Sequence, residues 1–370
     1  MPRQHVTDLN PSPSNARNSE GAFVTLADGR IMLAYTRYGK GGDDHDKAVI
    51  AARYSNDQGC TWSKRDRILV RGEGKANDMS VSLLRLHDGR IAMFNLRKDG
   101  LFDCRPVVRF SNDEGETFTA PNLITPVPGY YILNNDRVVQ LADGRIVAPL
   151  ALHHARTVID MQNGKPKTVP SFTQPGMIIF LSSDDGGHNW RDSNTRLFHC
   201  DKRGHGLQEP GLVELTRNKL WAYARHGAVG QFDPGNRQWS SFSNNASATW
   251  SDFEKSRFYS PCSPMSVKRI PATGDLLAVW NDHAPKHRIK NPHPISACRT
   301  PLACAISKDQ GKTWRHHQLL ETSPKHGFCY VAIHPMEDAV LLAYCAGGAD
   351  TGGCLKRLRL RRSELSELYQ

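Results

Sequence analysis

A short motif recurs along this chain and restricts the folds that the chain can adopt. It reads Ser-x-Asp-x-Gly-x-Thr-aromatic and occurs at residues 55–62, 111–118 and 307–314. A copy at 183–190 has Asn for Thr, and an eroded copy at 243–250 has Asn for Asp and Ser for Gly. In such a turn the Asp accepts hydrogen bonds from its own loop, the Gly adopts a positive φ, and the aromatic ring packs beneath. Repeated turns of this kind predict a fold built from repeated β-hairpins.

A second turn alternates with the first. Apolar runs break at Asp-Gly-Arg or a weaker equivalent, at residues 28–30, 88–90, 143–145, 217–218, 274–275 and 337–338. Successive turns lie roughly 55 to 75 residues apart, which is enough chain for one four-stranded sheet. Six such units predict an all-β fold, a six-bladed β-propeller of four-stranded antiparallel blades.

The same spacing predicts how the chain is organised. We expect residues 1–370 to form a single propeller domain, with either terminus adding the strand that closes the ring. Residues 160–170 fall in the longest step and are polar, with Gly and Pro, which predicts an inserted loop. Residues 356–370 form a basic C-terminal segment, with five basic residues in its first seven.

Composition limits the possible partners. The chain has 48 Lys and Arg against 37 Asp and Glu, a formal charge of +11, which favours anionic partners. Nucleic acid is not favoured, because basic residues interleaved with aromatics, zinc-finger spacing and helix-turn-helix patterns are missing from the sequence. No apolar run approaches the roughly 18 residues that a membrane span needs.

Cysteine usage indicates a reducing compartment. The nine cysteines are scattered without a Cys-x-x-Cys pair, so we expect free thiols and neither a disulfide framework nor a zinc site. The first residues lack an apolar core flanked by positive charge, and we therefore expect a cytoplasmic protein. A periplasmic or secreted location stays open if a leader was trimmed. We expect no cofactor and no metal.

The innermost strands of a propeller start around one axis, so the positions where they begin should share a cavity. Counting eight or nine residues back from each second turn gives Glu20, Ser80, Asn135-Asp136, Glu209, Met265 and Cys329-Tyr330. Four of these six positions carry a carboxylate or a phenol. Polar groups that converge on a concave surface are typical of a ligand pocket.

These repeats and pocket residues together resemble the sialidase (neuraminidase) superfamily, whose blades carry the first motif as the Asp box. The resemblance spans roughly residues 17–345. Asp boxes also occur in non-catalytic propellers, so the site residues must distinguish the alternatives. The family uses a Tyr nucleophile with a Glu partner, an Asp acid/base on a loop, and three Arg that hold the substrate carboxylate. A phenol approaches an anomeric carbon that bears a carboxylate with less charge repulsion than Asp or Glu would.

The resemblance assigns the reacting groups. Tyr330 matches the nucleophile, and Glu209 matches the Glu that takes its proton. The acid lies in the Gly-rich stretch 41–46, where Asp43 and Asp44 are equally good candidates.

The resemblance also assigns the arginines, with two departures. Arg225 and Arg299 match the second and third arginines. The family's first arginine belongs in an Arg-Ile-Pro motif where this chain has Ser19, and Arg17 lies two residues earlier. The Glu that steadies that arginine is replaced by Cys345. An acidic sugar other than sialic acid is therefore a possible substrate.

The resemblance implies an exo-glycosidase that hydrolyses a terminal acidic sugar, sialic acid or a related one, with retention through Tyr330. Its partner is an acidic glycan or glycoconjugate. Arg17, Glu20 and Asp136 complete the expected substrate contacts. Two alternatives stay open: a hydrolase or lyase acting on another uronate-type glycan, and a non-catalytic carbohydrate-binding propeller.

Each assignment also has a structural alternative. Tyr330 could be a core aromatic residue whose hydroxyl meets a backbone partner. Glu209 and Arg225 could form a purely structural ion pair, and Arg299 could bridge two blades. The stretch 41–46 could be a solvated loop or a cation site.

Overall fold

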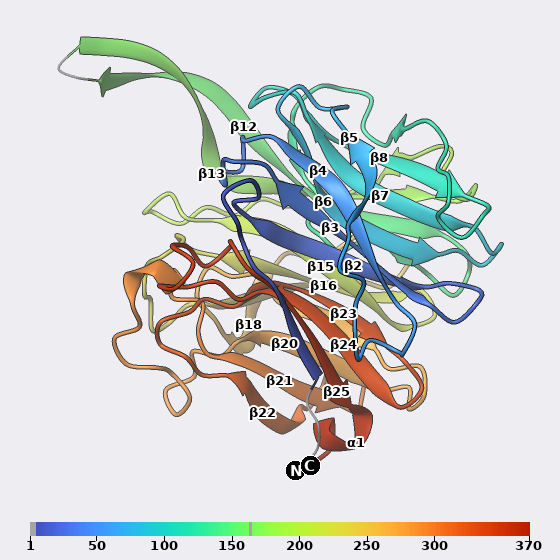
Figure 1. The fold of residues 1–370 in the computed structure, drawn as a ribbon. Helices are drawn as coiled ribbons and strands as arrows, with labels where there is room; N and C mark the ends of the chain where they lie inside the picture. The colour runs from blue at the N-terminus through green and yellow to red at the C-terminus, as the bar shows by residue number, and fades with distance from the viewer. Residues whose placement is uncertain (1–4, 163–164) are drawn as a thin grey trace.

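The computed structural model describes residues 5–162 and 165–370 and consists almost wholly of strands and turns. Its strands form six successive antiparallel blades, of which the second and third are joined into one nine-stranded sheet (Figure 1). Two short helical turns lie outside the sheets, a 3-10 helix at Pro294–Ser296 and α1 at Leu365–Leu368. These sheets confirm the predicted all-β, six-bladed architecture.

The first three blades occupy the N-terminal half of the chain. Blade 1 contains β2 (Asn18–Thr25), β3 (Ile31–Tyr38), β4 (Ala48–Ser55) and β5 (Arg67–Arg71). Blade 2 contains β6 (Asn77–Arg85), β7 (Ile91–Lys98), β8 (Cys104–Ser111) and β9 (Asn122–Leu123). Blade 3 contains β10 (Tyr130–Ile132), β11 (Val139–Gln140), β12 (Ile146–Gln162), β13 (Lys165–Ser183) and β14 (Arg191–Asp192).

The remaining blades follow in chain order. Blade 4 contains β15 (Leu207–Thr216), β16 (Lys219–His226), β17 (Arg237–Ser243) and β18 (Glu254–Tyr259). Blade 5 contains β19 (Ser266–Arg269), β20 (Leu276–Asn281), β21 (Leu302–Ser307) and β22 (Arg315–Glu321). Blade 6 contains β23 (Cys329–Pro335), β24 (Ala339–Cys345), β25 (Leu358–Glu364) and β1 (His5–Leu9).

The two ends of the chain close the ring together. β1 pairs antiparallel with β25, from His5 opposite Arg362 to Leu9 opposite Leu358 (Figure 1). The basic residues of 356–370 lie in or beside this strand, and Arg359 forms ion pairs of 2.8 Å with Asp8 and 2.9 Å with Glu321. Much of the predicted basic segment is therefore neutralised within the protein.

The Asp boxes act as structural turns. In the first, Asp57 accepts hydrogen bonds from the Thr61 amide at 2.8 Å and the Thr61 hydroxyl at 2.6 Å. Gly59 has a φ of +87°, and a Cβ placed on it would lie 2.4 Å from Leu341 of blade 6. Glycine is required there both by backbone conformation and by contact with the neighbouring blade. The box aromatics pack against apolar clusters, as Trp250 stacks on Phe180 at 3.9 Å.

One sequence prediction is wrong. Residues 160–162 and 165–170, expected to be an inserted loop, are strand, while residues 163–164 lie outside the described residues. β12 and β13 pair outward to Gln162 and Lys165, with one register shift between His153 and Ala155, and form an arm that projects from the propeller (Figure 1). A two-stranded arm has only edge strands, which tolerate Pro, so the prolines of this stretch are compatible with strand.

Candidate functional site

The innermost strands of five blades share one backbone distortion. Glu20, Ser80, Asp136, Glu209 and Tyr330 have φ values of 57°, 57°, 58°, 49° and 56°. Four of them coincide with register shifts between the first and second strands of their blades. A bulge re-aims a side chain, and positive φ in residues other than glycine is a strain that marks functional sites. These are positions that the turn spacing predicts.

The sixth predicted position differs from the other five. Met265 is a buried apolar residue immediately before β19. Blade 5 therefore contributes an apolar side chain at the point where the other blades present a polar or phenolic one.

Tyr330, Glu209 and Arg225 meet across the ring from blades 6 and 4. The Tyr330 hydroxyl donates to Glu209 Oε1 at 3.0 Å. Arg225 Nη1 lies 2.8 Å from Glu209 Oε2, close but not aligned as a hydrogen bond, and 3.4 Å from Tyr330 Oη. Burial, with help from the Glu209 charge, raises the pKa of Tyr330 well above its usual value. The phenol is thus neutral and hydrogen-bonded to a carboxylate that can take its proton, as an activated nucleophile requires.

Arg299 is buried next to this group with little to neutralise it. Its Cζ lies 5.2 Å from the centre of the Tyr330 ring, and its Nη1 donates to Cys329 Sγ at 3.0 Å. Its Nε has no hydrogen-bond partner, and within the described residues no carboxylate forms an ion pair with it. A buried guanidinium without a carboxylate is costly. This site therefore favours the entry of an anion.

Arg17 lies at the start of blade 1 and brings two carboxylates together. Its Nη2 is 3.2 Å from Glu20 Oε1, and its Nη1 is 2.6 Å from Asp44 Oδ1. Its Nε donates to the Ser19 hydroxyl at 2.9 Å. The other Glu20 oxygen accepts from Ser80 Oγ at 3.0 Å. Glu20 thus helps to hold the Arg17 guanidinium in place.

The structure separates the two candidates for the acid. The Asp44 carboxylate contacts Arg17, and its backbone carbonyl accepts from Lys98 Nζ at 2.7 Å and Asn77 Nδ2 at 2.9 Å. Asp43 and Asp44 are both exposed, and the Asp43 amide donates to Asp46 Oδ2 at 2.8 Å within the loop. Desolvation raises the pKa of Asp44, but Arg17 and Lys98 outweigh this effect and hold that pKa at about 2. Asp44, rather than Asp43, lies against Arg17.

Asp136 lies in the turn between β10 and β11 and has a different setting from the four bulge residues. Its carboxylate contacts Lys268 Nζ at 2.5 Å and accepts from the Ile333 amide at 2.9 Å. These contacts tie blade 3 to blades 5 and 6 rather than to the arginines. Its neighbour Asn135 donates to the carbonyls of Gly21 at 2.8 Å and Tyr330 at 3.1 Å. Asn135 and Asp136 thus link blade 3 to blades 1, 5 and 6 next to Tyr330.

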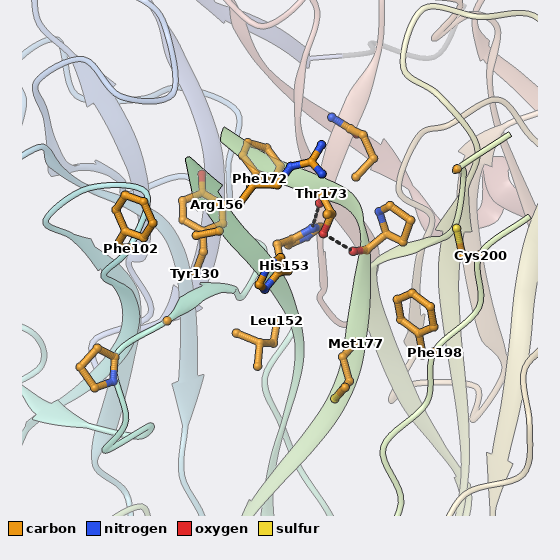
Figure 2. Close-up of a pocket in the computed structure, with 17 residues that line it drawn as sticks. Phe102, Tyr130, Leu152, His153, Arg156, Phe172, Thr173, Met177, Phe198 and Cys200 are labelled. Atoms are coloured by element: carbon orange, nitrogen blue, oxygen red, sulfur yellow. Dashed lines mark hydrogen bonds between the residues drawn. The ribbon is translucent and has the colours of Figure 1, made fainter. Parts of the chain in front are cut away.

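A cavity of about 860 Å³ adjoins these groups at the root of the arm. Figure 2 shows Phe102 and Tyr130 on one side of it and Phe198 on the other, with β12 and β13 between them. Lys98, which binds the Asp44 carbonyl, lies 5.5 Å from the centre of the Tyr130 ring. This cavity is largely apolar.

The cavity is linked to the Tyr330 group through two glutamine side chains. Gln174, one of its lining residues, contacts Gln208 at 3.4 Å, and Gln208 accepts from Arg225 Nη2 at 2.8 Å. Neither the cavity nor Gln208 is predicted from the sequence. The cavity lies at the root of the arm, and residues 160–170 of that arm were predicted to be a loop. Gln208 precedes the assigned residue Glu209 but belongs to no recognisable motif.

Comparison with known proteins identifies the family. The model of the BNR repeat-like domain matches residues 29–342. The chain belongs to this family. As a BNR protein it is 23% identical over 362 residues to a sialidase of Bacteroides fragilis, covering 86% of this chain and 58% of that relative. It therefore spans less than two thirds of that relative's length.

Solved structures agree on the fold of this BNR protein. A protein of unknown function from Dyadobacter fermentans superposes with a TM-score of 0.69 and 17% identity, covering 98% of this chain and 100% of that one. Trypanosoma rangeli sialidase in complex with 2,3-difluorosialic acid superposes with a TM-score of 0.71 and 13% identity, covering 100% of this chain and 60% of that one. At these identities the likeness concerns the fold alone.

Two further expectations can be compared with the structure. All nine cysteines are free, as their spacing predicts. Among the described residues, no helix is long and apolar enough to cross a bilayer.

Proposed function

We propose that this BNR-family protein is a retaining exo-glycosidase that removes a terminal acidic sugar, sialic acid or a close relative, from a glycan. The contact of 3.0 Å between Tyr330 Oη and Glu209 Oε1 carries the proposal. It pairs a neutral nucleophile with a base in a buried site lined by arginines. This arrangement suits an anomeric carbon that bears a negative carboxylate.

The reaction proceeds in two balanced steps. In the first, Tyr330 Oη bonds to the anomeric carbon while the bond to the leaving oxygen breaks; the phenol proton passes to Glu209, and Asp44 protonates the leaving oxygen. In the second, water attacks the anomeric carbon and gives a proton to Asp44, while the bond between that carbon and Tyr330 Oη breaks and Glu209 returns its proton to Tyr330. Two displacements at one carbon retain its configuration.

Binding of the substrate prepares Asp44 to act as an acid. In the free protein Arg17 holds the carboxylate ionised, because its Nη1 lies 2.6 Å from Asp44 Oδ1. A substrate carboxylate that reaches Arg17 competes for the same guanidinium. The pKa of Asp44 then rises, because the positive charge of Arg17 is shared with the substrate carboxylate. The Asp44 carboxyl thereby gains the proton that it must donate.

Arg299 supplies the second point of attachment. It is buried beside Tyr330 without an ion-pair partner among the described residues, so a substrate carboxylate provides the missing negative charge. The apolar cavity at the root of the arm then accepts the group attached to the acidic sugar. Its aromatic lining favours an aglycone with an apolar or planar face.

The test compares hydrolysis of a 4-methylumbelliferyl sialoside by the parent protein, Tyr330→Phe, Glu209→Gln and Tyr344→Phe. Tyr344 is the matched control, because it is a buried tyrosine of the same blade whose hydroxyl donates to Glu321 at 2.7 Å. We expect Tyr330→Phe to lose at least about 10³-fold in kcat. Glu209→Gln should lose about 10² to 10⁴-fold, and Tyr344→Phe should stay within about threefold of the parent.

Two results would overturn the proposal. One is a folded parent protein that is inactive on sialosides in several linkages. The other is a Tyr330→Phe variant as active as Tyr344→Phe. Turnover of a glucuronide or galacturonide in place of the sialosides would redirect the assignment to the uronate class.

A further inference from the structure

A second group of ligating side chains lies in blade 5, apart from the tyrosine and arginine groups. Asp282 directly follows β20, His287 lies in the loop after it, and His317 belongs to β22. The carboxylate oxygen and two ring nitrogens that they offer all lie within 4.8 Å of one another. Three elements separated in sequence thus bring two imidazoles and one carboxylate to a single point.

Both imidazoles converge on the same oxygen. His287 Nδ1 lies 2.5 Å and His317 Nε2 lies 2.8 Å from Asp282 Oδ2. The two rings stack with centroids 4.0 Å apart and planes at 14°. The other Asp282 oxygen accepts from the Ala284 amide at 2.8 Å, which fixes the orientation of the carboxylate. The convergence is therefore held by backbone as well as by side chains.

The site is built to be reached from one side. The Asp282 side chain is 6% exposed, whereas those of His287 and His317 are 18% and 28% exposed. The negatively charged Asp282 carboxylate is therefore buried, while the two imidazoles lie between it and the solvent.

The donor set and spacing fit a divalent transition ion. Zn²⁺ binds imidazole nitrogen and carboxylate oxygen at about 2.0 to 2.2 Å in a tetrahedral arrangement. Ligand atoms at those lengths are separated by roughly 3.3 Å. Each nitrogen therefore has to move away from Asp282 Oδ2 by less than about 1 Å, with its proton shifting to the other ring nitrogen. A rotation of the partly exposed rings supplies this movement.

We propose that Asp282, His287 and His317 bind one divalent transition ion of the Zn²⁺ type, with water in the fourth position. Two histidines and one carboxylate are a donor set of zinc and other first-row metals. The ion takes the place of the two hydrogen bonds that now join the imidazoles to the carboxylate. It cross-links β20, the loop that follows and β22.

The loop that the ion would fix leads to Arg299. His283, adjacent to Asp282, points the other way, and its Nε2 lies 3.1 Å from the carbonyl oxygen of Thr300. The segment from Asp282 to Thr300 is thus anchored at its start by the proposed ion and at its end through His283. Binding of the ion is independent of the proposed glycosidase activity; only its effect on Arg299 rests on that function.

The test uses untagged full-length protein, stripped with a chelator and dialysed, and titrated with Zn²⁺ by calorimetry. The variants are His317→Ala and Asp282→Asn, with His87→Ala as the control, because His87 is an exposed histidine of blade 2. We expect a single equivalent to bind the parent with a micromolar or tighter Kd. Loss of His317 should weaken that binding at least about 100-fold, and His87→Ala should match the parent.

A spectroscopic measurement keeps the test decisive if a variant is unstable. Co²⁺ added to the parent should give the intense visible bands of a tetrahedral site, and excess Zn²⁺ should abolish them. Hydrogen exchange of residues 284–298 should slow with Zn²⁺ in the parent only. The proposal is overturned if the parent binds no ion, if Co²⁺ stays octahedral, or if folded His317→Ala takes up Zn²⁺ as the parent does.

Discussion

The Nη1 atom of Arg17 lies 2.6 Å from Oδ1 of Asp44, so a guanidinium buried in blade 1 holds a carboxylate of the Gly-rich loop. The same guanidinium is 3.2 Å from Glu20, the bulge residue of its own strand. One cation therefore serves two carboxylates. The protonation of Asp44 depends on how that cation is shared.

Replacing Arg17 should change the titration of Asp44 directly. In Arg17→Ala we expect the pKa of the Asp44 carboxyl to rise from about 2 to about 4 or above, because the largest attractive charge is removed while burial remains. Carbon-detected NMR of the side-chain carboxyls across a pH series measures this change. Arg30→Ala, which removes an exposed arginine, is the control, and an unchanged Asp44 titration in Arg17→Ala would refute the prediction.

The contact between blades 1 and 6 can be tested with two glycines. Gly29 and Gly59 both have positive φ, but a Cβ on Gly29 meets open space, whereas one on Gly59 would lie 2.4 Å from Leu341. Gly29→Ala should lower the free energy of unfolding by about 1 kcal/mol, and Gly59→Ala by about 1 to 3 kcal/mol more. Urea denaturation measures both. Equal decreases in the free energy of unfolding for the two variants would mean that Leu341 can move away from the added methyl group at no cost.

The Asp boxes should make the stability of the protein decrease as the pH becomes acidic. Hydrogen bonds from Thr117 and Ser111 lower the pKa of Asp113 to about 2, below its value in the unfolded chain, near about 3.9. A lowered folded-state pKa contributes stability above the unfolded pKa, and this contribution is lost as pH falls toward the folded pKa. Asp113→Ala should thus have a lower Tm than the parent at pH 7. The difference should shrink between about pH 4 and pH 2.

Calorimetry at several pH values follows that comparison. Asp338→Ala is a suitable control, since Asp338 is an exposed residue outside the boxes. A Tm difference that stays constant down to the lowest pH would show that the hydrogen bonds to ionised Asp113 do not stabilise the turn.

Thiol labelling should distinguish the cysteines by burial. Cys200 is exposed, Cys60 and Cys298 are partly exposed, and the other six are buried. Burial raises the pKa of Cys329 to about 12, so its thiolate is scarce. Dithionitrobenzoate should label Cys200 within minutes and the six buried thiols only after unfolding. Rapid labelling of Cys329 in native protein would contradict the packing around Tyr330.

The bulges at Glu20, Ser80, Glu209 and Tyr330 could be located from sequence because the repeat fixes the offset between a turn and the bulge before it. Counting back from Gly29 gives Glu20, and the equivalent count gives Glu209 and Tyr330, since these blades use the same hairpin. The partnership of Arg17 with Glu20 could not be found by counting. It depends on the path of the chain before β2, where the repeat has not begun.

Loop geometry set the other limits. Asp43 and Asp44 are equivalent in a sequence, and only the turn closed by the Asp43 amide and Asp46 turns one of them toward Arg17. His287 and His317 lie on either side of β21, so no short spacing reveals that both contact Asp282. Side chains that are brought together by different loops and strands have no fixed spacing in the sequence, so no local motif predicts their contact.

The pairing of β1 with β25 sets an order of events during synthesis. β1, near the start of the described residues, pairs with β25, near their end, so it has no partner strand until residues 358–364 have been made. Until then blade 6 is missing β25 and has no place for β1. The strand that carries Tyr330 is then not yet fixed opposite Glu209. The earlier blades can form while the chain is still being made, but the site that spans blades 4 and 6 is completed only when the ring shuts.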